Sequence, residues 1–518
     1  MEAHRGMVPR LVCCVVVILA SATRANCKPP HIVFIVADDL GWNDVGWNNP
    51  KMATPNLNRL AKQGVILGSA YVQPICSPSR ASFMTGYFPI RLGLQQKSIR
   101  PHSSKRIPRN ITIIPEVLKS RGYATHMVGK WHLGFCNWKY TPTRRGFDSF
   151  FGNLFGSNDY YQHIANGEFF PEFKATSWLT SGPLSLIKSS LRMTSKVVIK
   201  GTDFRFNETV YREAIGHYAT ELFSERAVTV IERHDKAKPL FLYLAFKSPH
   251  GPLQVPKRYE RRCKKIKSKS RRIYCGMVAA LDEAVGNVTK ALFRTGLTDN
   301  LLLVFTSDNG GAVYVGGNNL PLRGAKTSLW EGGTRVPAFV FSPTLLGKRG
   351  YKHSGLFHGV DWLPTFAHVA GASTDQIRSI DGINQWQMLT KGRLSQRSEF
   401  VYNLDNQEKN GAIRFGDWKL IAGRAGVFNK WYPVMGEHVH NTDFDKDNTT
   451  DDSTYMLFNI KADPSERFDQ FSLEPTVAAA MVEKLDRWRG LMVPAQSADS
   501  HPRADPSLYD GVWTPGWC

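Results

Sequence analysis

After its N-terminus the sequence has no apolar stretch long enough to cross a bilayer. This absence excludes a polytopic membrane protein, because a transmembrane helix needs about 20 apolar residues. Cysteine is scarce, with 8 in 518 residues, so a hydrophobic core must provide most of the stability. Acidic residues are also few: 44 Asp and Glu stand against 66 Lys and Arg, a formal net charge of +22. The hydrophobic and charged fractions, 42% and 21%, are ordinary globular values and exclude a disordered or fibrous chain.

The N-terminus has the pattern of a secretory signal peptide. Arg5 and Arg10 precede an apolar run over residues 11–20, and small residues follow up to Ala25. Because the run is too short to span a membrane, we predict a signal peptide over residues 1–25, with an uncleaved anchor as the alternative. This route predicts a lysosomal or secreted protein with no stable membrane anchor. It argues against nucleic acid as the partner of the basic surface and favours acidic glycans.

Two further features agree with a secretory route. Asn-x-Ser/Thr acceptors for N-glycosylation occur at Asn110, Asn207, Asn287 and Asn448. Removal of residues 1–25 leaves six cysteines for an oxidising compartment, namely Cys27, Cys76, Cys136, Cys263, Cys275 and Cys518.

Strands and helices alternate over most of the chain. Apolar runs at residues 31–37, 122–128, 239–246 and 301–305 each end in a polar, glycine-containing or proline-containing turn, as is typical of strands covered on both faces. Helices are predicted after the cap Thr54, over residues 115–121 and over residues 274–294. We therefore predict an α/β catalytic domain over residues 28–375 with a mostly parallel central sheet.

The pattern changes after about residue 375. Short strands are predicted at residues 400–402, 411–415, 418–421 and 455–458, with a hairpin turn at Gly416-Asp417, and a helix follows over residues 476–492. These elements predict a smaller C-terminal domain over residues 376–518 with an antiparallel sheet.

Polar side chains of complementary kinds follow the predicted strands. Ligands in open α/β sheets bind beyond the carboxyl ends of the strands. The oxygen ligands there, Asp38, Asp39, Asp308 and Asn309, suit Ca²⁺ or Mg²⁺ better than zinc. The cationic donors, Lys130, His132 and His250, suit a tetrahedral oxyanion such as phosphate or sulfate.

The segment from Cys76 to Gly86 reads CSPSRASFMTG. It resembles the signature of the sulfatase family, Cys-x-Pro-Ser-Arg followed by Thr-Gly. The resemblance covers nearly the whole mature chain and lies closest to the arylsulfatase B branch, the N-acetylgalactosamine-4-sulfatases with their arylsulfatase I and J relatives. Matching text includes ADDLGWNDVG at 37–46, HMVGKWHLG at 126–134, PTRRGFD at 142–148, PLRGAK at 321–326, LWEGG at 329–333 and GVWTPGW at 511–517.

The resemblance implies a fold, a cofactor and a reaction. The family combines a large domain like that of alkaline phosphatase with a small four-stranded C-terminal domain. Its nucleophile is formylglycine, which a formylglycine-generating enzyme makes from the cysteine that matches Cys76. Its calcium ligands fall on Asp38, Asp39, Asp308, Asn309 and residue 76, and its sulfate-binding and catalytic groups fall on Arg80, Lys130, His132, His250 and Lys326. The implied substrate is an aryl sulfate or a sulfated glycan such as dermatan or chondroitin sulfate.

In the implied mechanism the hydrated aldehyde attacks sulfur, and collapse of its second hydroxyl releases sulfate. The family pattern gives His250 the leaving group and His132 the formylglycine hydroxyl. Two other functions remain open, an inactive glycan-binding homologue and a phosphodiesterase of the same superfamily. The Cys-x-Pro-Ser-Arg signature argues against the phosphodiesterase, and the intact set of site residues argues against the inactive homologue.

The chain also departs from the family. Most of the cysteines expected for the arylsulfatase B branch are absent, and Cys136 lacks its usual partner, whereas Cys263 and Cys275 are close enough in sequence to pair. Residues 155–205 diverge. Residues 257–272 contain ten Lys or Arg and one Glu, which predicts either a solvated, mobile loop or a rim that attracts sulfated glycosaminoglycan.

Overall fold

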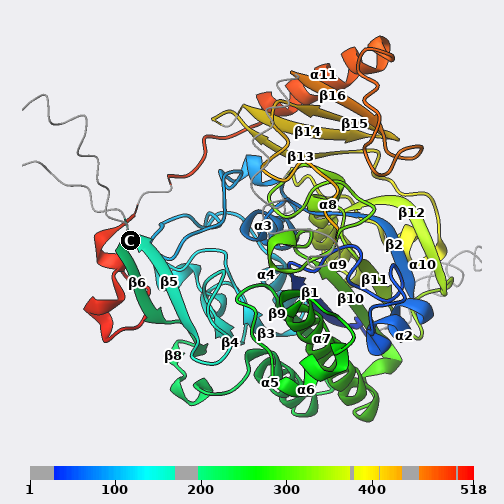
Figure 1. The fold of residues 1–518 in the computed structure, drawn as a ribbon. Helices are drawn as coiled ribbons and strands as arrows, with labels where there is room; N and C mark the ends of the chain where they lie inside the picture. The colour runs from blue at the N-terminus through cyan, green and yellow to red at the C-terminus, as the bar shows by residue number, and fades with distance from the viewer. Residues whose placement is uncertain (1–27, 170–196, 374–378, 408, 434–453, 498–499) are drawn as a thin grey trace, which may run out of the picture.

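The computed structural model describes residues 28–169, 197–373, 379–407, 409–433, 454–497 and 500–518 (Figure 1). The predicted signal peptide, most of the divergent 155–205 segment and the acceptor Asn448 lie outside these ranges. Within them, no helix has the length and apolar character needed to cross a membrane.

A ten-stranded sheet organises the large domain. Its order is β12 (Tyr351–His358), β2 (Val65–Tyr71), β11 (Ala338–Phe341), β10 (Leu301–Ser307), β1 (His31–Asp38), β9 (Leu240–Pro249), β3 (Ala124–Lys130), β4 (Ser149–Asn153), β7 (Arg205–Phe206) and β8 (Thr209–Val210). The four strands predicted from the apolar runs, β10, β1, β9 and β3, are neighbours at its centre and are mutually parallel. Antiparallel pairs occur only toward the edges, where β11 joins β10 to β2 and β7 joins β4 to β8. The predicted α/β class with a mostly parallel sheet is confirmed.

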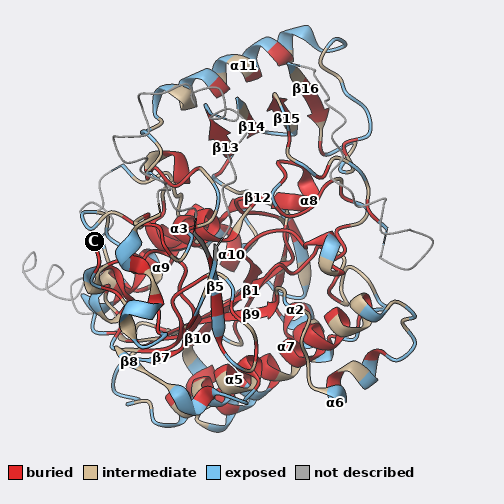
Figure 2. Cartoon of the chain, turned by 60° about the vertical axis from the view of Figure 1, so that its left-hand side comes forward, coloured by how far each residue is buried: buried red, intermediate tan, exposed pale blue. Residues whose placement is uncertain are grey.

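Both faces of this sheet are buried. Successive side chains of a strand point to opposite faces, so each strand contributes to the core on both sides. In β1, Ile32, Phe34 and Val36 enter one core cluster, whereas Val33, Ile35 and Ala37 enter the other. The first cluster is covered by α3 (Cys76–Thr85), α4 (Ile114–Lys119), α9 (Trp362–Val369) and α10 (Trp386–Lys391). The second is covered by α2 (Pro55–Gln63), α5 (Ala219–Glu232) and α7 (Lys269–Arg294). Figure 2 shows β1, β9 and β10 as almost entirely buried.

Shorter helical elements connect these layers. They are α6 (Lys257–Glu260), α8 (Glu331–Thr334) and the 3-10 turns η1 (Pro89–Arg91), η2 (Trp138–Tyr140), η3 (Pro142–Arg144), η6 (Arg212–Ala214), η7 (Arg261–Cys263), η8 (Leu297–Asn300), η9 (Val313–Val315), η10 (Gly359–Asp361), η12 (Pro502–Ala504) and η13 (Pro506–Tyr509). A separate hairpin pairs β5 (Ile164–Phe169) with β6 (Val197–Thr202).

Two details of the predicted helices were wrong. The long helix α7 begins at Lys269, five residues before the predicted start, because the Ser268 side chain accepts a hydrogen bond from the Arg271 amide and caps it. Thr54 makes no side-chain cap of α2. Its hydroxyl instead accepts from the Gly46 amide and donates to the Asn58 side chain.

The smaller sheet is antiparallel and four-stranded, in the order β13 (Glu399–Asp405), β14 (Asn410–Phe415), β15 (Trp418–Ala422) and β16 (Tyr455–Asn459). Phe415 pairs with Trp418, so Gly416-Asp417 forms the predicted two-residue turn. Helix α11 (Pro475–Gly490) packs on this sheet (Figure 1).

The C-terminal segment returns to the large domain. Trp513 and Trp517 belong to the first core cluster, and Cys518 forms a disulfide with Cys136. We propose the domain boundary near residue 375, as the sequence pattern indicates, with residues 500–518 packed against the large domain.

Candidate active site

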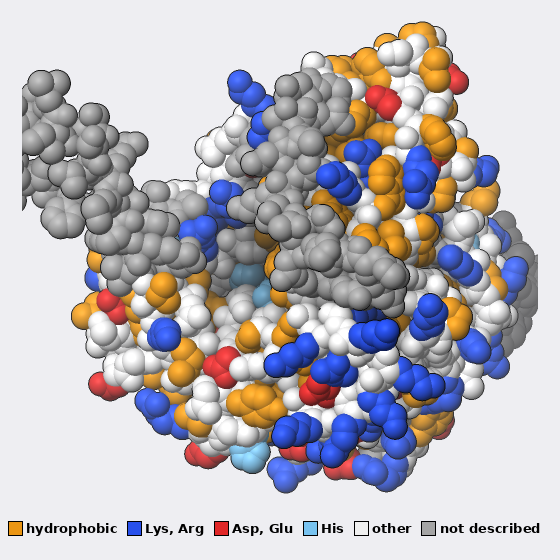
Figure 3. Space-filling view, viewed as in Figure 1, with side chains coloured by type: hydrophobic (Ala, Val, Ile, Leu, Met, Phe, Trp, Pro, Cys, Tyr) orange, Lys and Arg blue, Asp and Glu red, His pale blue; other side chains and the backbone are white. Residues whose placement is uncertain are grey.

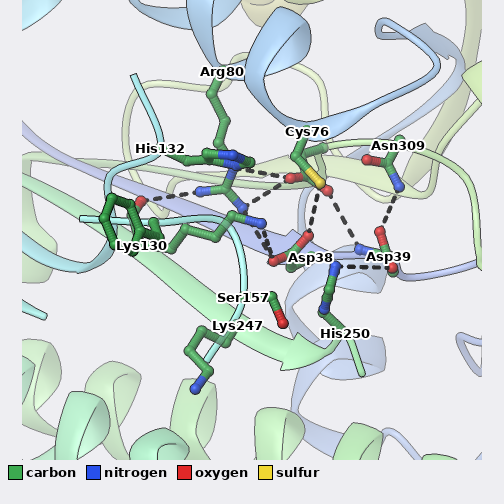
Figure 4. Close-up of polar contacts among 12 residues, drawn as sticks. Asp38, Asp39, Cys76, Arg80, Lys130, His132, Ser157, Lys247, His250 and Asn309 are labelled. Carbon is green, nitrogen blue, oxygen red and sulfur yellow. Dashed lines mark hydrogen bonds and ion pairs between the residues drawn. The ribbon is translucent and has the colours of Figure 1, made fainter. Parts of the chain in front are cut away.

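The polar groups predicted at the strand ends converge at the carboxyl ends of the central strands. Asp38 ends β1, Lys130 ends β3, His250 follows β9 and Asp308 follows β10. Because these strands are parallel and adjacent, their carboxyl ends lie together. Cys76, the first residue of α3, points into the same place (Figure 4).

Buried ion pairs connect these residues. The Arg80 guanidinium donates to Asp308 at 2.9 Å and to the Lys130 carbonyl at 3.1 Å. Lys130 Nζ lies 2.5 Å from Asp38 Oδ2, and Cys76 Sγ lies 3.4 Å from Asp38 Oδ1.

A second group of contacts surrounds Asp39. Lys326 Nζ approaches Asp39 Oδ1 at 2.7 Å, and His250 Nε2 lies 3.7 Å from Asp39 Oδ2. Asn309 donates its amide to Asp39 Oδ1 at 2.7 Å. These contacts join nine of the ten residues predicted for the site, and Figure 4 shows the tenth, His132, in the same place.

The two histidines differ in their exposure and hydrogen bonds. His132 is buried; its Nε2 lies 2.9 Å from the Ile99 carbonyl, and its Nδ1 has no partner among the described residues. His250 Nδ1 lies 2.6 Å from the Gly251 carbonyl, which directs its Nε2 toward the site. Since a carbonyl only accepts, the ring nitrogen facing it carries the proton in each case. The His250 side chain is 20% exposed, whereas Arg80 and Asp38 are fully buried, so His250 lies at the mouth of the site.

Two residues of the site adopt left-handed backbone conformations that disfavour side chains. Asp39 has φ of 62° and His132 has φ of 57°. Such conformations persist where the surroundings fix them, and they cluster at functional sites. A tertiary bond fixes Asp39, because the Tyr274 hydroxyl donates to its carbonyl at 2.9 Å.

The oxygen donors fit a hard divalent cation. One ligand atom each from Asp38, Asp39, Cys76 and His250 lies within 4.8 Å of the others. Asn309 Oδ1 is buried with no hydrogen-bond partner among the described residues, although buried amide oxygens are normally paired. A cation ligated by Asp38, Asp39, Asp308 and Asn309 would satisfy that oxygen.

Burial and crowding shift the acidities of this site. Burial and the neighbouring Asp38 raise the pKa of Asp308 to about 6. Burial alone would raise the pKa of Asp38, but Lys130, His250, Arg80 and Lys326 oppose it, and the net shift is strongly downward. Burial, helped by Asp308, raises the pKa of the Cys76 thiol, which leaves it protonated and a poor nucleophile.

The pKa values of both histidines of the site are lowered. Burial lowers the pKa of His132, with Lys130 adding to the effect. Burial also lowers the pKa of His250, with Lys326 as the next cause.

Three residues around the site were not predicted from the sequence. Ser157 donates to the Gly251 carbonyl at 3.3 Å, the same carbonyl that orients His250. Only glycine fits at position 156, because a Cβ there would lie 2.3 Å from the His132 ring. Lys247 is buried below the site (Figure 4) and donates to the Asn158 carbonyl at 2.9 Å; burial lowers its pKa to about 7. Of these three residues, only Lys247 could have been suspected from the sequence, because it lies near the end of an apolar strand.

The other predicted positions are the glycosylation acceptors and the cysteines. Asn110 and Asn287 are exposed, whereas Asn207 is half-buried and accepts from the Phe150 amide. Cys263 and Cys275 form the local disulfide that their spacing allowed. Cys76 is the free thiol of the described residues.

Residues 257–272, here named the basic face, are mostly helical. They form α6, η7, a connection over residues 264–268 and the first turn of α7, and the Cys263–Cys275 disulfide links η7 to α7. Figure 3 shows histidine side chains in a hollow and Lys and Arg gathered on the same side of the molecule, over α6 and α7. The expectation of a loop holds only for residues 264–268, because the rest of the segment is helical.

Comparison with known proteins agrees with this geometry. The sulfatase family profile matches residues 30–372. Arylsulfatase J of Mus musculus is 37% identical over 519 residues, covering 95% of this chain and 81% of that protein. N-acetylgalactosamine-6-sulfatase of Homo sapiens is 29% identical, covering 85% of this chain and 81% of that protein. The crystal structure of Ps i-CgsB in complex with k-i-k-neocarrahexaose superposes with a TM-score of 0.74 at 30% identity, covering 93% of this chain and 97% of that chain.

The chain therefore belongs to the sulfatase family, and the resemblance seen in the sequence is confirmed. It is an enzyme that hydrolyses sulfuric esters.

Proposed function

We propose that the protein hydrolyses a sulfate ester of a glycan, of the N-acetylgalactosamine 4-sulfate type found in dermatan and chondroitin sulfate, and that it also accepts small aryl sulfates. The observation that carries the proposal is the convergence of Arg80, Lys130, Lys326 and two histidines around Cys76 beside three carboxylates. The name of one relative, N-acetylgalactosamine-6-sulfatase, and the carrageenan oligosaccharide in one similar structure support a sulfated sugar as substrate.

Two groups complete the proposed site. Formylglycine at position 76, a hydrated aldehyde, supplies one hydroxyl to bond sulfur and a second whose collapse releases sulfate. A bound Ca²⁺ supplies positive charge at the reacting centre, held by Asp38, Asp39, Asp308, Asn309 and residue 76.

The chain's own residues have separate roles in this proposal. Arg80, held by Asp308, places its charge beside residue 76. Lys130 and Lys326 lie where they can neutralise sulfate oxygens. His132 Nδ1, which has no partner among the described residues, can accept a proton from a hydroxyl at position 76. His250, at the mouth, can protonate the leaving oxygen from Nε2 in its doubly protonated form, because Nδ1 keeps its proton for the Gly251 carbonyl.

The secretory calls belong to the same proposal. We propose removal of residues 1–25, modification of Cys76 by a formylglycine-generating enzyme, N-glycosylation at Asn110, Asn207, Asn287 and Asn448, and delivery to the lysosome or to the extracellular space.

The test compares substrates on protein made in secretory cells. Sulfate release is measured from 4-nitrophenyl sulfate, N-acetylgalactosamine 4-sulfate and N-acetylgalactosamine 6-sulfate, and bis(4-nitrophenyl) phosphate serves as the phosphodiester. We expect both the aryl sulfate and the 4-sulfate to be hydrolysed, with the 4-sulfate preferred over the 6-sulfate. Preference for the 6-sulfate would contradict the proposed sugar position. Turnover of the phosphodiester alone would instead indicate a phosphodiesterase, and glycan binding without any turnover an inactive homologue.

A further inference from the structure

A pocket of about 830 Å³ opens beside the nucleophile, between the large domain and the small sheet. This volume lies within the roughly 300–1,000 Å³ typical of ligand pockets. One wall is formed by residues 95–105, and the opposite wall by residues of β13, β14 and the loop between them. Its lining includes Ile75 and Thr327, which directly precede the nucleophile Cys76 and follow Lys326 in the chain.

The charged side chains of this pocket are mostly cationic. Among the residues that the structure describes, Lys97, Arg100 and Lys105 share this lining with one carboxylate, Asp405. Lys97 and Arg100 are exposed, and neither has an ion pair within the ranges that the structure describes. Lys105 is only 3% exposed and donates to the Gln96 carbonyl at 3.2 Å.

The electrostatic balance of the pocket favours an anion. Burial lowers the pKa of Lys105, and Lys97 and Arg100 lower it further, while Asp405 opposes the shift. Asp405 is already used as an acceptor, since the Gln96 side chain donates to it at 3.0 Å. An anionic group bound in the pocket would relieve the repulsion among the three cations.

The cationic wall is anchored to the catalytic residues. The Ile99 carbonyl faces His132 Nε2 at 2.9 Å, and the Ile99 amide donates to the hydroxyl of Ser77 at 3.1 Å. Ile99 lies between the two exposed cations, so the backbone that carries them is fixed relative to the nucleophile. A sulfated sugar that reacts at residue 76 would therefore place its neighbouring sugar in reach of them.

We propose that this pocket is a subsite for a second anionic group of the glycan, either the carboxylate of the uronate next to the reacting sugar or a second sulfate on the sugar beyond it, bound by Lys97, Arg100 and Lys105. The inference rests on the proposed function, because it assumes a glycan substrate at the same nucleophile. It makes the enzyme selective for an acidic glycan chain over an isolated sulfated sugar.

The experiment measures kcat and KM of the whole enzyme on a chondroitin 4-sulfate trisaccharide with N-acetylgalactosamine 4-sulfate at both ends of a glucuronate. A carboxyl-reduced form and a form lacking the second sulfate separate the two anion sources, and 4-nitrophenyl sulfate reports the reaction without the subsite. The variant is Lys97→Gln with Arg100→Gln. The matched control is Arg233→Gln with Lys236→Gln. These two exposed cations precede β9 and so lie at the amino end of that strand, away from the active site.

We expect the double variant to raise KM for the trisaccharide about tenfold, as for the loss of one charge-assisted contact, while the control variant leaves it unchanged. Removing the responsible anion should raise KM of the wild type similarly and should have little further effect on the variant. If KM of the wild type rises when the carboxylate is reduced, the carboxylate is the bound anion. If KM rises when the second sulfate is absent, that sulfate is the bound anion.

The subsite is overturned if neither anion affects KM, or if the variant loses as much on 4-nitrophenyl sulfate as on the trisaccharide. Failure of the proposed function looks different, since then the unmutated enzyme releases no sulfate from any of these substrates, and the subsite falls with it.

Discussion

The active site and the basic face both gather Lys and Arg side chains, but in opposite surroundings. At the active site, Arg80, Lys130 and Lys326 are buried and each pairs with an aspartate. On the basic face, Lys257, Arg261, Lys264, Lys265, Lys267 and Lys269 are exposed without an ion pair to any residue that the structure describes. Arg258, Arg262 and Arg272 do pair there, with Glu221, Glu283 and Glu260.

The difference shows what each set of charges can do. Buried pairs act at short range and lose little to salt, whereas exposed charges act through a field that salt screens beyond about 8–10 Å. Removing a buried charge leaves its partner unpaired at a cost of several kcal/mol. Removing one exposed lysine costs little. The buried site should therefore control the chemical step, and the basic face should control only the encounter with polyanions.

The largest expected effect comes from the nucleophile. Cys76→Ala and Cys76→Ser should each lower kcat about 10⁴-fold or more, because neither side chain can form the aldehyde and release sulfate by its collapse. Peptide mass spectrometry of the wild type should show formylglycine at position 76. The serine variant should retain one covalently bound sulfate per molecule after incubation with substrate. An unmodified thiol in fully active wild-type enzyme would rule out the proposed nucleophile.

Loss of the metal should have the next largest effect. Asp308→Asn weakens a proposed Ca²⁺ ligand and also removes the partner of Arg80, so we expect kcat/KM to fall about 10²–10³-fold. Thermal unfolding gives a readout that does not depend on activity: Ca²⁺ at about 100 times Kd should stabilise the wild type by about 2.7 kcal/mol. The control is Asp235→Asn, an exposed carboxylate ahead of β9. A full Ca²⁺ response in Asp308→Asn would place the cation elsewhere.

A second buried charge cluster extends the comparison to stability. Lys419 pairs with Glu331 at 3.1 Å and with Glu466 at 2.7 Å, and all three side chains are fully buried. Burial raises the pKa of Glu466 to about 7, with Glu331 adding to the rise and Lys419 opposing it. The folded-state pKa of Glu466 exceeds the unfolded value, so its protonated carboxyl stabilises the folded protein. This contribution to the free energy of unfolding is complete below pH 4.5 and is lost as pH rises through 7.

Glu466→Gln should therefore remove a pH dependence of up to about 3 kcal/mol between pH 4.5 and 8. Unfolding temperatures of the wild type should fall relative to those of the variant across this window. Glu474→Gln, an exposed glutamate nearby in the chain, is the control and should follow the wild type. Parallel curves for all three proteins would show that Glu466 stays ionised.

The centre of the fold could be predicted because its strands are long and continuously apolar. β1, β3, β9 and β10 followed from this pattern, and the parallel arrangement then brought Asp38, Lys130, His250 and Asp308 to one edge. The strands outside this centre gave no such signal. β7 and β8 have two residues each and β11 has four, and both β7 and β11 pair with strands distant in the sequence, β4 and β2.

The assignment of Cys76 needed the family resemblance, because neither spacing nor burial reveals a modified residue. The supporting residues could not be predicted, since they depend on tertiary approach. Ser157 and His250 share the Gly251 carbonyl across 94 residues of chain. Likewise, Cys136 and Cys518 pair over 382 residues, and nothing in the last residues indicated that they return to the large domain.

The smallest expected effect tests the basic face. Neutralising Lys264, Lys265, Lys267 and Lys269 to Gln should lower kcat/KM for polymeric chondroitin sulfate several-fold at low salt, because the lost charges no longer attract the chain over a distance. Raising salt should lower the polymer rate of the wild type in the same way and should affect the neutralised variant less. Turnover of 4-nitrophenyl sulfate should respond little to either change, since its chemistry depends on buried, paired charges.

Rigidity of the basic face sharpens this prediction. Cys263→Ser with Cys275→Ser keeps every charge but opens the disulfide that links η7 to α7, a loop closure worth about 2–3 kcal/mol. Hydrogen exchange in α6 and η7 should accelerate, while the salt dependence on polymer should persist, because a screened field needs the charges nearby rather than in one geometry. If the serine pair loses the polymer preference as fully as the glutamine variant does, the face binds the glycan through a fixed arrangement of contacts. If neither variant changes the polymer rate, the exposed lysines are only a solvated surface, and the encounter is governed by the pocket beside the nucleophile.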